Sequence, residues 1–155
     1  MTPSPPSYPS IIRLARSGSL ERAWALMAEQ GLLDSASDPR AMTLQARLVK
    51  DRAKRADGAD RARLFAESAA IYAKAAAVDG SSYPLINAAT LSLLAGKQDA
   101  ARRLAEEVLA MLDANPDEAE TPYWLGATRA EALLLLGQEA EARAALRQSI
   151  SRQPA

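Results

Sequence analysis

The sequence predicts an all-α protein in which about eight helices form antiparallel pairs that stack as an α-solenoid. Alanine, leucine, glutamate and arginine, all good helix formers, dominate the chain from Ser10 onward. Glycines and prolines punctuate the 155 residues at short intervals, and two segments in the second half repeat each other. β-branched and aromatic residues are sparse and do not alternate, so we expect no strands.

The first residues differ in composition from the rest of the chain. Residues 1–9 contain four of the nine prolines together with two serines. Such a segment favours extended, polyproline-like conformations over a helix. We therefore predict a flexible Pro/Ser-rich arm over residues 1–9 and a single helical repeat domain over residues 10–155.

Start and stop signals divide this domain into helices. Asp38-Pro39 and Thr121-Pro122 each combine an N-cap acceptor with a proline at the first helical position, and Ser82 before Tyr83-Pro84 is similar. Glycines at 18, 31, 58, 80, 96 and 137 are each expected to cap a preceding helix in the left-handed conformation. The predicted helices span residues 10–17, 19–30, 38–56, 60–78, 82–95, 98–113, 121–136 and 138–152.

An internal repeat links the third and fourth helix pairs. A shift of 41 residues places Ala89 on Ala130, Leu93-Leu94 on Leu134-Leu135, Gly96 on Gly137 and Ala101 on Ala142. Near the start, Gly18 is followed by Ala23 at the same spacing. Glycine turns the chain because it adopts positive φ at little cost. The alanine is expected where the second helix of a pair crosses the first, since a larger side chain would separate the two backbones.

These residues carry a family resemblance. Gly137, Ala142, Leu146 and Pro154 resemble the glycine, small residue, large apolar residue and terminal proline of a tetratricopeptide repeat (TPR), and Gly96 with Ala101 follows the same frame. The resemblance implies a TPR-like right-handed superhelix. The usual period is 34 residues, whereas 41 also lies in the range of HEAT-like repeats. The extra residues are expected in the connection at 113–120.

A closer resemblance covers residues 83–146, with the runs YPLINAATLSLLAG, ARRLAEEVL and YWLGATRAEALLLLG. This part is similar to the TPR-like region next to TRAF-binding segments in apoptosis-signalling kinases and in many bacterial proteins. Residues 44–80 fit the same pattern. The resemblance implies an interaction and regulatory module without catalytic residues. Because the kinase domain is absent, kinase activity is not implied.

Composition argues against several classes of function. The chain has no histidine and no cysteine, which removes the commonest general base and the commonest metal ligands. No nucleotide-binding, hydrolase or metalloprotease motif occurs, so we expect no enzyme activity and no cofactor. Nineteen basic and nineteen acidic side chains cancel. The longest strongly apolar stretch, Ala132–Leu136, is far too short to span a membrane, and the start lacks a signal peptide, so a cytoplasmic protein is expected.

The predicted binding surface is the concave face, which the first helix of each pair lines in TPR-like stacks. The candidate contacts are the outward positions of the helices at 38–56, 82–95 and 121–136, namely Arg47, Lys50, Lys54, Tyr83, Asn87, Thr90, Trp124, Thr128 and Glu131. They would form a groove with a basic wall, hydroxyl and amide groups in the middle and an aromatic anchor. Such a groove suits a protein or peptide partner that carries acidic residues.

Asn87 lies in an apolar stretch, so we predict a buried amide that bonds a ligand or a neighbouring helix. The alternative interpretation is that the basic residues are ordinary solvated surface and that Tyr83 and Trp124 pack between pairs. The apolar run Leu133–Leu136 near the end of the stack favours docking or homodimerisation through the last helix pair. The local basic excess over residues 47–63 leaves RNA binding as a further alternative.

Overall fold

The computed structural model describes residues 7–115 and 122–151, and these residues form eight helices and no strand. The helices are α1 (Tyr8–Arg16), α2 (Leu20–Glu29), α3 (Pro39–Arg55), α4 (Gly58–Asp79), α5 (Ser82–Leu94), α6 (Gln98–Ala114), α7 (Pro122–Leu135) and α8 (Glu139–Ser151). Each lies within two residues of its predicted bounds, and the predicted fold class is confirmed. Thr121 and Pro154, which the sequence analysis singled out, lie outside the described residues.

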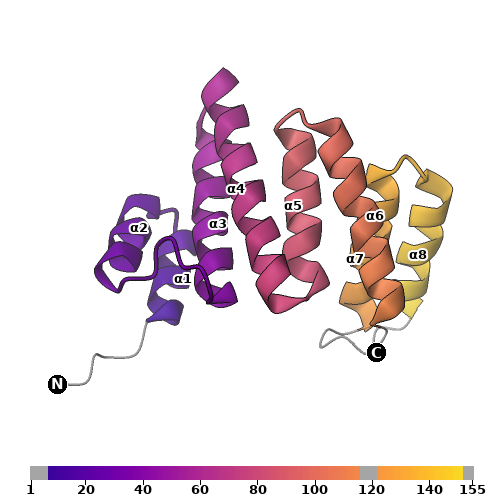
Figure 1. Ribbon diagram of the computed structural model, residues 1–155, viewed down its shortest axis with the longest axis horizontal. Helices are drawn as coiled ribbons and strands as arrows, with labels where there is room; N and C mark the ends of the chain where they lie inside the picture. Colours follow the sequence, from indigo (N-terminus) through magenta and orange to yellow (C-terminus); the bar gives the residue numbers. More distant parts are fainter. Residues whose placement is uncertain (1–6, 116–121, 152–155) are drawn as a thin grey trace.

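The helices pack as four consecutive pairs that follow one another along the long axis of the molecule (Figure 1). The pair α1–α2 lies at one end and the pair α7–α8 at the other. Between pairs, α2 contacts α3, α4 contacts α5, and α6 contacts α7. The first helices of the last two pairs, α5 and α7, also contact each other directly. This neighbour-to-neighbour stacking is the arrangement of a helical repeat protein.

The turns within three of the pairs share one hydrogen-bond pattern. At the end of α5, the Gly96 amide donates to the Leu93 carbonyl at 2.9 Å, and the Lys97 amide donates to the Ser92 carbonyl at 2.9 Å. The same two bonds recur at Gly18 and at Gly137, and all three glycines have positive φ. Five residues later the chain places a buried alanine at Ala23, Ala101 and Ala142. The predicted glycine and alanine frame is therefore confirmed.

Gly58 does not cap the preceding helix as predicted. α3 already ends at Arg55, and Ala56 follows it in an extended conformation. Gly58 has φ of +56° and is the first residue of α4. Positive φ at this point turns the chain into the new helix rather than closing the old one. For this reason α4 begins two residues earlier than expected.

Residues 1–6 of the predicted arm lie outside the described residues, and its last two residues are wrongly assigned, because Tyr8 and Pro9 lie in the first turn of α1. A proline fits there because the first helical amides have no partner within the helix. Tyr8 is buried, and its hydroxyl donates to Oδ2 of Asp38 at 2.6 Å. The guanidinium of Arg40 lies over the Tyr8 ring, 4.2 Å from its centre. Tyr8 thus fastens the first pair to the start of α3.

This hydrogen bond is expected to make stability depend on pH. The Tyr8 hydroxyl holds the pKa of the Asp38 carboxyl below its ordinary value of 3.8. Burial, together with the bond to Asp38, raises the pKa of Tyr8 from 10.0 to about 12. A lowered carboxyl pKa stabilises the fold fully above pH 3.8, and this contribution disappears as the pH falls through the folded-state value. A raised phenol pKa stabilises it below pH 10.0, and this contribution disappears as the pH rises toward 12.

Tyr8→Phe removes only the hydroxyl and is expected to lower the free energy of unfolding by about 1 kcal/mol near neutral pH. Urea unfolding of both proteins, followed by circular dichroism, measures the difference. The gap should close as the pH falls through the lowered pKa of Asp38, below which the carboxyl is protonated in both proteins. A gap that stays constant across this range would show that the ionised carboxylate does not contribute.

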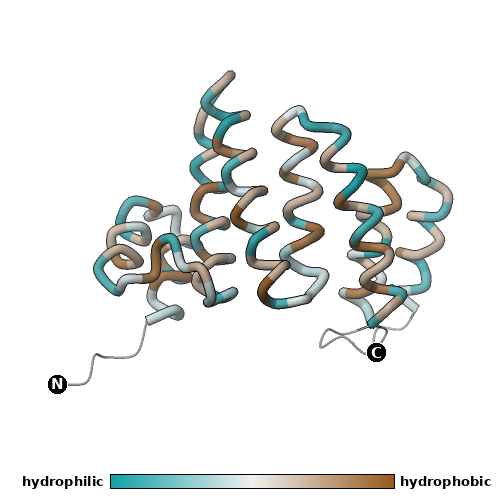
Figure 2. The backbone as a smooth tube through the Cα atoms, viewed as in Figure 1, coloured by the Kyte–Doolittle hydropathy of each residue, from teal (hydrophilic) through white to brown (hydrophobic). Residues whose placement is uncertain are grey.

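The core consists of three overlapping clusters along the stack. The first joins α1, α2 and α3, the second joins α3, α4 and α5, and the third extends from α4 to α7. Many of the fully buried residues are alanines. Figure 2 shows apolar and polar residues interspersed along each helix, so each helix has a buried side and an exposed side. None of the described helices is long and apolar enough to cross a membrane.

Candidate functional site

The outward sides of α3, α5 and α7, here called the first-helix face, carry all nine predicted contact residues. On α3 the apolar residues Met42, Ala46, Val49 and Ala53 are buried. The basic row Arg47, Lys50 and Lys54 lies on the other side of this helix. The acidic residue Asp51 lies between these cations. Asp51 lies 4.0 Å from Arg47 Nε and 4.0 Å from Lys54 Nζ. The basic wall is therefore partly neutralised by its own helix.

Lys50 is a half-buried cation on this wall. Its Nζ lies 5.9 Å from the centre of the Tyr72 ring on α4. Burial lowers the pKa of Lys50, and the charges of Lys54 and Arg47 lower it further. Asp51 and Glu131 act in the opposite direction but do not restore the ordinary value. Lys50 is thus a cation whose charge is incompletely compensated by its surroundings.

A direct bond joins α5 to α7 on the same face. The Thr90 hydroxyl donates to Oε1 of Glu131 at 2.7 Å. These residues are 41 positions apart, which is the shift of the internal repeat. The same shift relates Tyr83 to Trp124 and Asn87 to Thr128. The repeat therefore places equivalent positions of neighbouring first helices side by side.

Tyr83 and Trp124 form the aromatic part of the face. Tyr83 is 52% exposed and Trp124 is 58% exposed. Together with Ser82 and Thr128 they line a hollow of about 210 Å³, and none of these four described lining residues is charged. The Trp124 ring meets the Tyr123 ring edge-on, with the ring centres 5.1 Å apart. Two large aromatic side chains with this much exposed area form the kind of apolar patch that often marks an interaction site.

A second hollow, of about 150 Å³, lies on the other side of Tyr83. Its walls come from α1, α3 and α5, and its lining residues are Tyr8, Ile12, Arg40, Thr43, Leu44, Arg47 and Tyr83. The predicted face did not include α1, so Tyr8, Ile12, Arg40 and Thr43 were not among its predicted residues. The sequence does contain a pattern that indicates these residues. Tyr8 and Ile12 are one helical turn apart, so their side chains share one side of α1. Arg40, Thr43 and Arg47 likewise share one side of α3.

Asn87 differs from its prediction. Its side chain is half-buried, and Nδ2 donates to the carbonyl of Tyr83 at 2.9 Å, within the same helix. The apolar residues that surround Asn87 in the sequence, such as Ile86 and Ala88, are buried on the other side of α5. The predicted buried amide bonded to a neighbouring helix is therefore wrong. Asn87 lies on the first-helix face as a short polar side chain held by its own backbone.

The basic residues of the stretch 47–63 do not gather into one patch. Arg52 lies over the Trp24 ring at 4.4 Å, and Arg55 donates to the Gly18 carbonyl at 2.8 Å. Arg63 lies 3.9 Å from both Asp60 and Glu67. Arg52 and Arg55 thus connect α3 to the first helix pair, whereas Arg63 forms ion pairs within α4. They do not offer the continuous positive track that a nucleic-acid backbone requires.

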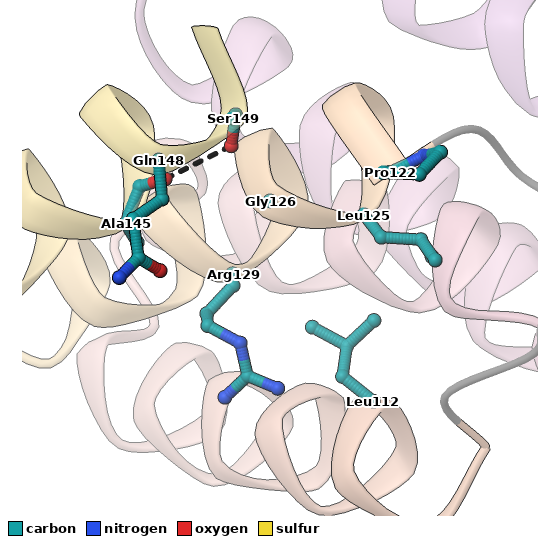
Figure 3. Close-up of a pocket in the computed structure, with 8 residues that line it drawn as sticks. All are labelled: Leu112, Pro122, Leu125, Gly126, Arg129, Ala145, Gln148 and Ser149. Carbon is teal, nitrogen blue, oxygen red and sulfur yellow. Dashed lines mark hydrogen bonds between the residues drawn. The ribbon is translucent and has the colours of Figure 1, made fainter. Parts of the chain in front are cut away.

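A third hollow, of about 270 Å³, lies away from the two at Tyr83, among α6, α7 and α8 (Figure 3). Leu112, Leu125 and Arg129 are among its lining residues, and Arg129 pairs with Asp113 at 2.7 Å. On the α8 side, Ser149 packs directly against Gly126 of α7. A Cβ atom at position 126 would lie 1.8 Å from the Ser149 hydroxyl oxygen. This close contact sets the spacing of α7, which carries Trp124, and α8.

Comparison with known proteins bears on the family of this chain. No curated protein and no solved structure matches the sequence. The sequence does match the family described as Tetratricopeptide Repeats-Sensor (TPR-S) over residues 10–92, more than half of its 155 residues. The match extends from α1 into α5, and it includes the residues 44–80 that already resembled a TPR-like region. The chain therefore belongs to the Tetratricopeptide Repeats-Sensor family.

Proposed function

We propose that this protein is a non-catalytic interaction module whose first-helix face binds a segment of a partner protein. One observation carries the proposal: the half-exposed Tyr83 stands between two hollows to which four helices, α1, α3, α5 and α7, contribute side chains. TPR-like families are associated with protein partners, and the family's name describes a sensor. A sensor of this kind would report the presence of its partner by binding it.

The size of the hollows favours side chains over a small molecule. Pockets for cofactors or drug-sized ligands usually enclose about 300–1,000 Å³. The two hollows at Tyr83 measure about 150 and 210 Å³, and each is open to the surface. Each can therefore accept one side chain of a bound polypeptide. The absence of histidine and cysteine from the sequence is consistent with a role without catalysis.

Affinity capture from the native host tests the proposal. The bait is the full chain, compared with the variants Tyr83→Ala and Lys50→Glu, both of which change a side chain on this face. We expect both variants to lose at least about tenfold of the captured partner, as is typical when a central contact is removed. Arg103→Glu, an exposed charge reversal on α6, is the matched control and should capture as the wild type does. Equal capture by all four baits would contradict binding at the first-helix face.

We also propose that the protein self-associates through its last helix pair. Leu146 and Ile150 are 42% and 55% exposed on α8 and lie one turn apart, and Leu134 on α7 is 60% exposed. Burying these side chains against a second copy would remove apolar area from water. The variant Leu146→Glu/Ile150→Glu should reduce a dimer to a monomer by light scattering at tens of micromolar. A wild-type protein that is strictly monomeric there would contradict the proposal.

A further inference from the structure

We infer that α1 and α2 open and close on α3 as one unit, separately from the rest of the stack, and that the first-helix face is complete only when this unit is closed. The inference rests on the proposed function and deepens it by stating how the face is regulated. Three features carry it: the size of the two helices, the contacts that hold them to α3, and the connection that follows them.

The helices of the first pair are too short to be stable by themselves. α1 has 9 residues and α2 has 10, whereas isolated helices below about 12–15 residues are marginal in water. Their buried residues, such as Ile11 and Met27, pack with Leu44 of α3. α3 joins the next cluster through other residues, Ala46 and Ala53, so that cluster does not depend on the first pair. Because the pair lies at the end of the stack (Figure 1), opening it exposes less apolar area than opening an inner pair.

Polar side chains at both ends of α3 help to hold the first pair closed. At the start of α3, the Tyr8 hydroxyl donates to Asp38 at 2.6 Å, and the guanidinium of Arg40 lies 4.2 Å from the centre of the Tyr8 ring. Near its end, the guanidinium of Arg52 lies 4.4 Å from the centre of the Trp24 ring on α2. Water and salt compete with contacts of this kind, so each stabilises the closed state only modestly. They can break together while α3 keeps its own packing.

The connection between α2 and α3 supplies a hinge. It spans residues 30–38, whereas α3 and α4 are joined by residues 56–57 alone. Its second half is fixed to α3, because Gln45 accepts a bond from the Asp34 amide at 2.7 Å and donates to the Asp34 carboxylate at 3.1 Å. The bend is therefore expected at residues 30–33. Hinges are typically a few loop residues that absorb a change in φ and ψ.

Opening the first pair removes one wall of the hollow of about 150 Å³ beside Tyr83. α1 contributes Tyr8 and Ile12 to this hollow, and α3 and α5 contribute residues such as Arg47 and Tyr83. A partner side chain that fills the hollow contacts both sides, so it binds the closed state better than the open one. Binding therefore closes the first pair, and closing the pair raises the affinity for the partner.

Hydrogen exchange of the free full chain, followed by mass spectrometry, tests the inference. Amides of residues 8–29 should exchange at least about tenfold faster than those of α3 and α4, because they open without global unfolding. Tyr8→Phe should speed exchange about fivefold in α1 and α2 alike and leave α4 unchanged. Arg103→Glu on α6 is the control and should change neither. Exchange as slow in residues 8–29 as in α4, or a response to Tyr8→Phe in α1 without α2, would overturn the inference.

Methionine oxidation by dilute hydrogen peroxide gives a second measurement on the free chain. Met27 of α2 is 0% exposed and Met42 of α3 is 3% exposed, so in the closed state both are protected. We expect Met27 to be oxidised about tenfold faster than Met42, and Tyr8→Phe to speed only the oxidation of Met27. Equal rates at the two methionines would contradict a separate opening. The capture experiment with Tyr83→Ala tests the proposed function independently, so the two failures are distinguishable.

Discussion

Replacing Phe65 by alanine is expected to lower the free energy of unfolding by about 3–5 kcal/mol. Phe65 is 2% exposed and lies in the central cluster, where α3, α4 and α5 meet. Its buried neighbours include Ala46, Ala53, Ala69 and Ala88. Such short side chains cannot move into the space that the ring leaves, so the cavity persists. The loss in free energy of unfolding is therefore expected at the upper end of the range for truncating a core side chain.

Urea unfolding of the full chain, followed by circular dichroism, measures this effect. Val78→Ala is a matched control, because Val78 lies on the same helix and is 47% exposed. That change should alter the free energy of unfolding by no more than about 0.5 kcal/mol. If Phe65→Ala unfolds at nearly the same urea concentration as this control, the cluster between the second and third pairs is not packed as described.

Gly126→Ala is expected to destabilise the protein by about 1–3 kcal/mol, although the same change inside a helix usually stabilises it. Gly126 is an interior residue of α7, where glycine normally costs about 0.5–1 kcal/mol relative to alanine. Here the new Cβ would lie 1.8 Å from Oγ and 2.9 Å from Cβ of Ser149. Both atoms belong to a side chain that is 2% exposed, so α7 and α8 would have to separate.

A second substitution isolates this contact. Ser149→Gly removes both close atoms, and the nearest remaining atom, Cα of Ser149, lies at an ordinary 3.5 Å. In this background Gly126→Ala should become neutral or stabilising. The double-mutant cycle should therefore show a coupling of about 1–3 kcal/mol between the two positions. Additive effects would show that the last pair is not packed through Gly126 and Ser149.

The local elements of this fold can be predicted from the sequence because their signals are local. Asp38 before Pro39 starts α3, and its carboxylate accepts bonds from the amides of Arg40 and Ala41. Gly96 and Gly137 end the first helices of their pairs with the same turn. The repeat also places Thr90 and Glu131 at equivalent positions. Signals of this kind depend on a few neighbouring residues and do not require knowledge of the packing.

The binding surface was harder to predict because it depends on how helices pack against each other. The hollow at Arg47 needs α1 to approach α3, and Tyr8 achieves this through its bond to Asp38, 30 residues away. Composition alone assigned Tyr8 to an arm. Likewise, the apolar sequence around Asn87 predicted burial, but the outward side of α5 leaves its amide at the surface. Which side of a helix faces out is set by the neighbouring pairs.

The central claim is that the first-helix face is the surface that meets the partner. Hydroxyl-radical footprinting of the full chain, free and bound to a captured partner protein, tests it most directly. The account predicts that Tyr83 and Trp124 are oxidised in the free protein and become protected on binding, while Val78 on α4 stays equally reactive. Protection of Val78 with no change at Tyr83 and Trp124 would place the partner on another surface and contradict the account.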